Sequence, residues 1–299
     1  LNRYIDLHRG LGFKFRSQAI LLRGFVREAQ TNGDTLVRTE TVLAWAAQAP
    51  SPPQRRLRLL TVRRFALMMH AEDPSHDVPA ADALGRARLE RRAPYIYAPG
   101  EIVRLVRAAM EMTPQGTIVP QMYATLFGLL AATGLRVSEA LALRCDDITA
   151  DGLIVRQTKF RKDRLVPLHG TTWAALDCYL EARKQVAACN STLFVLANGS
   201  APTYDMVNPT FRRLATQLGL RGRPDQPDAR IHDLRHTFAV RSLEQCPGDR
   251  AAVARHIAGL STYLGHAHVT DTYWYLSATP FLMRRIAERG EACYLGDPT

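Results

Sequence analysis

Four segments, widely separated along the chain, contain residue types that together can act on a phosphate group. Arginine binds phosphate oxygens through its paired N–H groups, lysine and histidine can give or take a proton, and a tyrosine hydroxyl can attack phosphorus as a nucleophile. This hydroxyl has an ordinary pKa of about 10, so it needs a cationic surrounding that favours the phenolate. The residues concerned are Arg136, Lys159, His232, Arg235, His266 and Tyr275.

The order of these segments resembles the active-site set of the tyrosine recombinases, a family that includes the phage-type integrases. The segments read TGLRVSEA at 133–140, TKFRKDR at 158–164, HDLRH at 232–236 and LGH at 264–266, with Tyr275 nine residues after His266. Each motif alone occurs by chance in unrelated proteins, but here all of them occur in the family order. The resemblance implies an enzyme that breaks and rejoins DNA through a phosphotyrosine.

The resemblance also implies that Arg136 and Arg235 bind the scissile phosphate. Glu139 follows Arg136 by three residues on the same predicted helix, a spacing at which an acidic side chain can pair with an arginine. Such pairs are common on solvated helix surfaces as well. The family pattern has an arginine and an acidic residue at this spacing, which favours a supporting role for Glu139.

Lys159 lies on a predicted turn between two β-rich runs and aligns with the catalytic lysine of the family. The family pattern is commonly Gly-Lys-Gly-x-Lys-x-Arg, whereas Phe160 here replaces the second small residue. A lysine on such a turn is usually just solvated, but a hairpin tip can also place it beside the leaving 5′ oxygen as a general acid. Lys162 is the second candidate for this role, and Arg161 and Lys162 are expected to contact DNA.

His232 is expected to assist proton transfer, and His236 to support packing. The two histidines, four residues apart on one helical face, also have the spacing of a zinc-binding pair. The glutamate that zinc proteases place after the first histidine is absent, and Arg235 would oppose the charge of a metal ion. The chain also lacks the carboxylate cluster of a two-metal nuclease. We therefore expect no metal ion and no other cofactor.

Two tyrosines compete for the role of nucleophile. Tyr273 and Tyr275 differ by about 200° around a helix, so only one of them can face the site. The spacing from His266 favours Tyr275, as in the family, while Tyr273 is expected to be an aromatic packing residue. His268 is expected to have no role in the chemistry.

The composition indicates a polyanionic partner. The chain of 299 residues is 46% hydrophobic and carries a formal net charge of +11. The excess is concentrated before residue 93, where lysine and arginine outnumber aspartate and glutamate by 7, against 4 in the remainder. A surplus of positive charge of this kind is typical of proteins that bind nucleic acid.

The N-terminal region is predicted to be a helical, core-binding domain over residues 1–75. Apolar residues recur at helical spacing, and turn residues cluster at 32–34 and 50–53. A dense basic face follows the second turn. Such a face is a solvated surface or a contact to the DNA backbone; our candidate DNA-binding residues are Arg55, Arg56, Arg58, Arg63 and Arg64.

A proline-containing linker is predicted at 76–95, followed by a tyrosine recombinase catalytic domain at 96–299. The apolar run 123–132 predicts a buried helix that ends at Gly134. Residues 152–158 and 164–168 predict an antiparallel hairpin, with a short strand before it near 147–148. The expected fold is therefore mainly α (α+β). A helical domain and a mostly helical catalytic domain with a small antiparallel sheet would form a C-shaped clamp around DNA.

The predicted function is that of a site-specific recombinase or integrase of a mobile element, acting through a 3′-phosphotyrosyl intermediate. The alternatives are a type IB topoisomerase-like nicking-closing enzyme and a catalytically silent DNA-binding protein. The expected partners are double-stranded DNA at specific sites and further copies of the chain, as a tetramer on two sites. The segment 278–295, with Phe281, Leu282, Met283 and Ile286, is predicted either to dock on a neighbouring copy or to pack within its own subunit.

The cysteines indicate a reducing compartment. They are five in number and form no Cys-x-x-Cys pair, which indicates neither a disulfide framework nor a thiolate zinc site. No apolar run is long enough to cross a membrane, and no signal pattern opens the sequence. We expect a cytoplasmic, nucleoid-associated protein of a bacterium, with no membrane partner.

Overall fold

The structure is a computed structural model that describes residues 1–85, 92–156, 163–186, 191–246, 250–266 and 268–277, together with Glu291. The chain forms two compact units, Leu1–Arg91 and Arg92–Thr299. Three predicted site residues, Lys159, Arg161 and Lys162, lie outside the described residues, as does nearly all of the segment 278–295.

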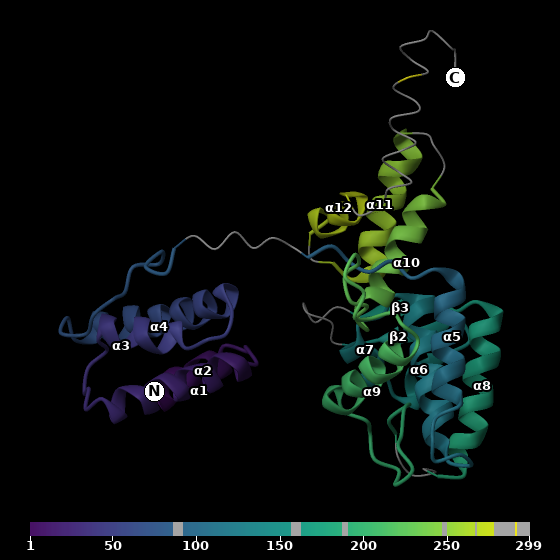
Figure 1. The fold of residues 1–299 in the computed structure, drawn as a ribbon, viewed down its shortest axis with the longest axis horizontal. Helices are drawn as coiled ribbons and strands as arrows, with labels where there is room; N and C mark the ends of the chain where they lie inside the picture. Colours follow the sequence, from purple (N-terminus) through teal and green to yellow (C-terminus); the bar gives the residue numbers. More distant parts are fainter. Residues whose placement is uncertain are drawn as a thin grey trace. The chain divides into compact units, whose positions relative to one another are not determined.

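The first unit is helical (Figure 1), as the apolar spacing predicts. Its helices pack through one buried stripe each, and Leu22, Phe25, Trp45 and Phe65 are among the side chains that meet in the core. The last and longest helix begins with two prolines, which the first turn of a helix accepts because its N–H groups have no partner there. The helices are α1 (Asn2–Gly10), α2 (Arg16–Thr31), α3 (Thr39–Ala47) and α4 (Pro52–Glu72).

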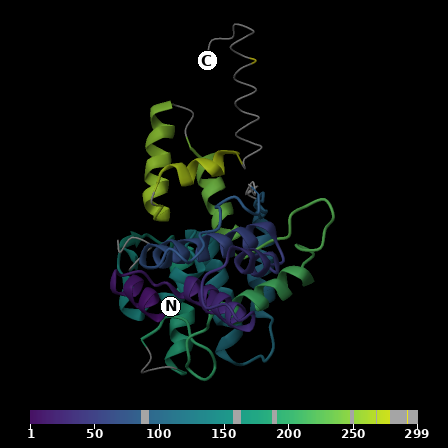
Figure 2. The same cartoon turned by 90° about the vertical axis from the view of Figure 1, so that its left-hand side faces the viewer.

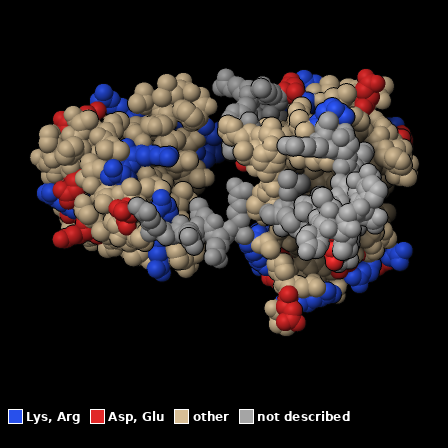
Figure 3. All heavy atoms as spheres, turned by 90° about the horizontal axis from the view of Figure 1, so that it is seen from above, with Lys and Arg blue, Asp and Glu red and all other residues tan. Residues whose placement is uncertain are grey.

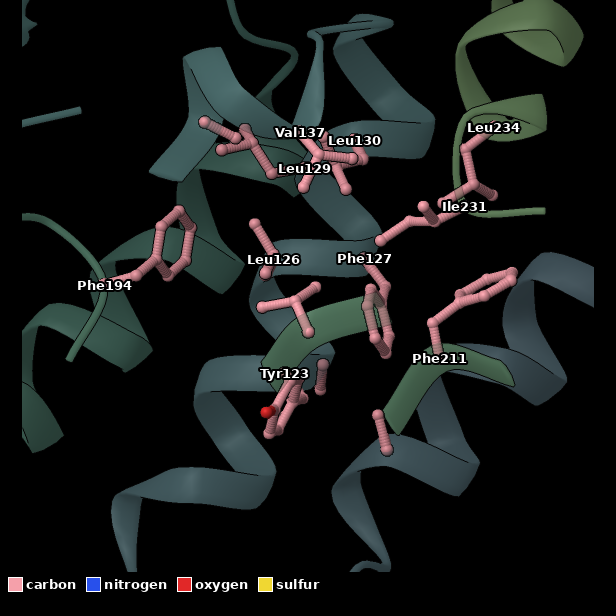
Figure 4. Packing of buried hydrophobic residues seen from close by; sticks show 14 of the residues in the cluster. Tyr123, Leu126, Phe127, Leu129, Leu130, Val137, Phe194, Phe211, Ile231 and Leu234 are labelled. Carbon is pink, nitrogen blue, oxygen red and sulfur yellow. The ribbon is translucent and has the colours of Figure 1, made fainter. Parts of the chain in front are cut away.

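The second unit is built around α6, a helix whose residues are mostly apolar and mostly buried. Its residues Tyr123, Leu126, Phe127 and Leu130 are buried among the surrounding elements (Figure 4). The Phe127 ring meets the Phe211 ring edge-on at 5.7 Å between centroids. The helices are α5 (Pro99–Met110), α6 (Ile118–Thr133), α7 (Val137–Ala142), α8 (Gly170–Lys184), α9 (Tyr204–Gln217), α10 (Asp233–Glu244), α11 (Arg250–Leu264) and α12 (Thr270–Ser277).

A small antiparallel sheet lies between α7 and α8. The short 3-10 turn η1 (Cys145–Asp147) leads into β1 (Ile148–Thr149), β2 (Gly152–Val155) and β3 (Arg164–Val166), which pair in the order β1-β2-β3. Leu153 pairs with Val166, and both side chains are buried in the core. The predicted mainly helical fold with a small antiparallel sheet is therefore confirmed.

Helices α10, α11 and α12 enclose a second apolar cluster in this unit. Figure 2 shows α11 and α12, in yellow-green, standing together at one end of the fold. Val240, Leu243, Leu260 and Leu264 form this cluster, and the Tyr275 ring packs into it. The packing places α12 beside the start of α10, where the candidate site lies.

Gly134 makes the sharp chain reversal between α6 and α7 possible. It ends α6 with a left-handed φ of +62°, and its N–H bonds to the Leu130 carbonyl oxygen. A Cβ atom at this position would approach the Phe238 ring to 2.6 Å. Only glycine combines this φ with so close a contact, and the reversal brings Arg136 to the start of α7.

Candidate active site

Arg136 and Glu139 form a rigid pair at the start of α7. Arg136 Nη1 donates to Glu139 Oε1 at 2.7 Å, and the Arg136 backbone N–H donates to Oε2 of the same carboxylate at 3.0 Å. Arg136 Nη2 also donates to the Gly265 carbonyl oxygen at 3.2 Å. The predicted pairing of Arg136 with Glu139 is thus present in the structure.

Arg164 on β3 shares the same carboxylate. Its Nη1 and Nη2 donate to Glu139 Oε1 and Oε2 at 3.1 and 2.7 Å, in a bidentate arrangement. Burial by itself would raise the pKa of Glu139, but the hydrogen bonds from Arg164 and Arg136 and their charges hold it at about 2. The predicted site residues did not include Arg164. Its only signal in the sequence is the arginine that closes the family pattern of the hairpin turn.

Arg235 on α10 is the most enclosed arginine of the group, with 2% of its surface exposed. Its Nη1 and Nη2 donate to the carbonyl oxygens of Gly134 and Leu264, each at 2.7 Å. Burial and then the nearby charge of Arg136 lower its pKa to about 10. Arg235 therefore joins the end of α6 to the end of α11 and stays positively charged at neutral pH.

The histidines surround this arginine. Burial, and then the charges of Arg235 and Arg136, lower the pKa of His266 to about 4; its Nδ1 lies 2.8 Å from the Thr272 hydroxyl oxygen. His232 keeps an exposed side, while the protein atoms around the rest of its ring and the charge of Arg235 lower its pKa too. Both side chains are consequently neutral imidazoles at neutral pH.

His236 lies deeper than the other two histidines. Its ring contacts His232 at 4.7 Å, Trp274 at 4.9 Å and Tyr275 at 5.4 Å between centroids. Burial, followed by the effect of His232, lowers its pKa to about 3. Among the residues that the structure describes, no three His, Cys, Asp or Glu side chains are grouped as a metal site would need.

The two candidate tyrosines have opposite environments. Tyr275 is 3% exposed, stacks against His266 at 5.9 Å between centroids, and lies close enough to Arg235 for the two side chains to interact electrostatically. Tyr273 is 51% exposed. The structure therefore brings Tyr275, and not Tyr273, to the arginines and histidines.

The candidate DNA-binding arginines of α4 are only in part free to meet a ligand. Arg58 lies over the Trp45 ring at 4.7 Å and donates to the Trp45 carbonyl oxygen at 2.8 Å, and Arg55 donates to the Ala49 carbonyl oxygen at 2.8 Å. Arg63 bonds to the Pro79 carbonyl oxygen. Arg56 and Arg64 have no such bond within the described residues. Figure 3 shows blue Lys and Arg side chains on the surface of both units.

Comparison with known proteins identifies the family. Residues 99–280 match the phage integrase family. The Sinorhizobium fredii protein y4rB, named an integrase/recombinase, is 40% identical over 302 residues, which cover 97% of this chain and 96% of that protein. The tyrosine recombinase XerD of Listeria monocytogenes is 27% identical over 270 residues, covering 87% and 84%. The chain belongs to the phage integrase family of tyrosine recombinases.

Solved structures show the same fold. A lambda integrase dimer bound to a COC′ core site aligns with a TM-score of 0.66 at 19% identity, covering 92% of this chain and 93% of that chain. The XerA recombinase aligns with a TM-score of 0.53 at 22% identity, covering 97% and 96%. In the described parts of this chain, no helix combines the length and apolar character that crossing a membrane requires.

Replacing Glu139 by glutamine should destabilise the protein at neutral pH. The pKa of Glu139 falls from 4.5 to about 2 on folding, which corresponds to about 3 kcal/mol of stability. Because the folded pKa is the lower one, this contribution is complete above pH 4.5 and disappears as the pH falls from 4.5 towards 2. Urea unfolding at pH 7 and at pH 3 should show a large gap between wild type and variant at pH 7 and a smaller one at pH 3.

Glu181 provides the control for this experiment. It also pairs with a cation, Lys184, but both side chains are mostly exposed, at 71% and 65%. Exposed pairs contribute little, so Glu181→Gln should leave stability nearly unchanged at both pH values. If the free energy of unfolding differed between wild type and Glu139→Gln by the same amount at pH 7 and pH 3, the ionised carboxylate would not be the source of the stabilisation.

Tyr97 ties the start of the second unit to the turn that carries His232. Its buried hydroxyl donates to the Arg230 carbonyl oxygen at 3.0 Å, and its backbone N–H donates to the Thr237 hydroxyl oxygen at 3.0 Å. Tyr97→Phe should slow DNA cleavage about 5-fold, the equivalent of about 1 kcal/mol for one buried hydrogen bond. Single-turnover cleavage at saturating protein measures this change.

Tyr95 supplies the matched control for Tyr97. Its hydroxyl donates to Glu101 at 2.8 Å, away from α10, although the two tyrosine rings are in contact at 5.0 Å. Tyr95→Phe removes the same atom but no bond to the turn before α10. The cleavage rate should therefore stay within 2-fold of wild type, which corresponds to a change of less than roughly 0.4 kcal/mol in the barrier. Equal losses in both variants would indicate a general loss of stability instead of a displaced turn.

Proposed function

We propose that this protein is a site-specific DNA recombinase that cuts and rejoins strands through a covalent bond between Tyr275 and a 3′ phosphate. The observation that carries the proposal is that the buried Tyr275 ring stacks against His266, while Arg136 and Arg235 bond to the carbonyl oxygens of Gly265 and Leu264 just before that histidine. Membership of the tyrosine recombinase family supports the same conclusion.

In the proposed reaction the Tyr275 oxygen attacks phosphorus while the bond from phosphorus to the 5′ oxygen breaks. His232, neutral because its pKa is lowered, accepts the tyrosine proton, and Lys159 protonates the leaving 5′ oxygen. Arg136 and Arg235 bind the non-bridging oxygens and stabilise the charge that develops there. His266 donates an N–H to the same phosphate. Each step exchanges one phosphodiester for another, so no external energy source is needed.

Rejoining is the reverse of cleavage with a different strand. A free 5′ hydroxyl of a partner duplex attacks the phosphotyrosine, and the tyrosine hydroxyl is restored. We propose that copies of the chain act together as a tetramer on two sites, and that the arginine-rich first unit holds the DNA as a core-binding domain. A lambda integrase tetramer bound to a Holliday junction has the same fold, with a TM-score of 0.63.

The proposed biological role is the movement or integration of a mobile element on nucleoid DNA in the bacterial cytoplasm. The integrase/recombinase name of the Sinorhizobium fredii relative supports this role. No metal ion or other cofactor takes part in the proposed steps.

A strand-exchange assay tests the proposal. Two duplexes of different length, each with the binding site selected by the protein from random sequence, should give covalent protein–DNA adducts and recombinant strands of new length. Relaxation of a supercoiled plasmid with a single site, without recombinant strands, would indicate a topoisomerase-type enzyme. Specific binding with neither adduct nor product would leave a silent DNA-binding protein.

A further inference from the structure

A pocket of about 290 Å³ opens in the second unit beside the candidate active site. It is lined by Arg92 and by residues of α9, of the loop that follows α9, and of the turn that precedes α10. Ile231 lines the pocket while it also belongs to the buried cluster near Phe211 (Figure 4). His232 belongs to both the pocket and the proposed active site, so the two are adjoining parts of one surface.

The charges that line this pocket do not balance. Arg221 pairs with Asp228 at 3.0 Å, and Arg230 pairs with Asp233 at 2.9 Å. Two further guanidinium groups line the pocket, those of Arg92 and Arg212. In the described part of the chain neither is at ion-pair distance from a carboxylate, although both are close enough to the Asp228 carboxylate, the partner of Arg221, to help lower its pKa. Two positive charges are therefore left for a ligand.

One face of α9 supplies two neutral hydrogen-bonding side chains and one guanidinium group. Tyr204, Asn208 and Arg212 are spaced four residues apart, so they lie above one another along the helix and line the pocket together. The adjoining face, with Val207 and Phe211, is buried in the core and holds this row in place. The row extends over about 12 Å of helix, which suits an extended chain better than a single small ion.

We propose that this pocket binds a phosphate of the cleaved DNA strand next to the scissile phosphate, through Arg212 and Arg92. The proposal rests on the proposed function, since it assumes that the scissile phosphate lies at Arg136 and Arg235. The pocket and the active site share His232, so a strand that leaves the active site on this side passes along the row on α9. Guanidinium groups without a carboxylate partner give strong, bidentate bonds to phosphate oxygens.

Neutral phosphates in the DNA test the proposal directly. The protein carries Tyr275→Phe, so that bound DNA stays intact, and its preferred duplex carries a methylphosphonate at one backbone position at a time. We expect a neutral linkage at one or two positions beside the cleavage point to weaken binding about 10-fold, as for one charged hydrogen-bonded contact. Arg212→Gln should weaken binding of natural DNA by a similar factor. With this variant, the methylphosphonate duplex should bind less than about 2-fold more weakly than natural DNA, because the contact is already lost.

Arg213 is the matched control, because it is the next residue on α9, is exposed as Arg212 is, and does not line the pocket. Arg213→Gln should leave the effect of each methylphosphonate unchanged. The proposal would be overturned if each methylphosphonate weakened binding by the same factor in Arg212→Gln as in the protein that retains Arg212, at every backbone position. So would Arg212-dependent binding of inorganic phosphate or a nucleoside monophosphate without any coupling to a DNA position, because the pocket would then serve a free anion.

The proposed chemistry can fail separately. The same duplexes, nicked at the cleavage point and incubated with protein that retains Tyr275, report the covalent adduct on a denaturing gel. If the adduct forms but Arg212→Gln and the methylphosphonates act independently, the phosphate pocket is rejected and the recombinase function stands. If Arg212→Gln and a methylphosphonate depend on each other but no adduct forms, the pocket stands as a DNA contact and the phosphotyrosine chemistry is rejected.

Discussion

Replacing Tyr275 by phenylalanine should abolish the covalent protein–DNA complex and leave DNA binding nearly unchanged. The substitution removes the attacking oxygen alone, and the ring that packs among α10, α11 and α12 remains. A nicked duplex that traps cleavage, analysed on a denaturing gel, should give a shifted band with wild type and none with the variant. The expected loss is complete, because no other group in the proposed reaction forms the covalent bond.

Tyr273→Phe is the internal control for this result. Its side chain is half exposed, whereas that of Tyr275 is buried, so the covalent complex should form at the wild-type rate. A band that persists in Tyr275→Phe and disappears in Tyr273→Phe would show that the nucleophile is the other tyrosine. It would also mean that α12 turns by about half a circle when DNA binds.

Replacing Arg235 by lysine should slow cleavage by a factor of about 100 to 1000, the usual effect of losing one donor that stabilises developing charge. Its guanidinium bonds at once to the carbonyl oxygens of Gly134 and Leu264 and lies beside Tyr275. An ammonium group is a single point of charge and cannot make these contacts together with a phosphate. Single-turnover cleavage with saturating protein separates this effect from weaker binding.

Arg241→Lys on the same helix is the control. Arg241 bonds to the Tyr97 carbonyl oxygen and lies about two turns further along α10, so the cleavage rate should change little. A rate for Arg235→Lys within 10-fold of wild type would show that positive charge alone is needed at this position, and not the paired geometry of a guanidinium.

The helices and the sheet could be predicted from the sequence because the buried side of a helix or strand requires apolar residues at a regular spacing. The run 123–132 is almost entirely apolar and lies within α6, while short β-rich runs on either side of a charged turn form β2 and β3. Gly134 was predictable as the end of α6. The close approach of the Phe238 ring to this glycine was not, since the two are 104 positions apart in the sequence.

The candidate site could be predicted only for residues whose type and place in a motif indicate their role. The predicted set included Arg136, Arg235 and Tyr275, and the structure places these three side chains around one point. Arg164 was absent from it because its carboxylate partner, Glu139, is 25 residues away and belongs to another element. Likewise, no local pattern shows that Arg58 bonds to the Trp45 carbonyl oxygen, so the sequence presents it as a free surface arginine.

The backbone carbonyl oxygens that hold Arg136 and Arg235 have a consequence for the entropy of binding. A free arginine side chain loses about 2 kcal/mol of rotamer entropy when it is fixed in one position. Here the oxygens of Gly134, Leu264 and Gly265 impose that order during folding. A phosphate that arrives at these guanidinium groups therefore meets donors that are already immobile, and its binding energy remains available for the reacting atoms.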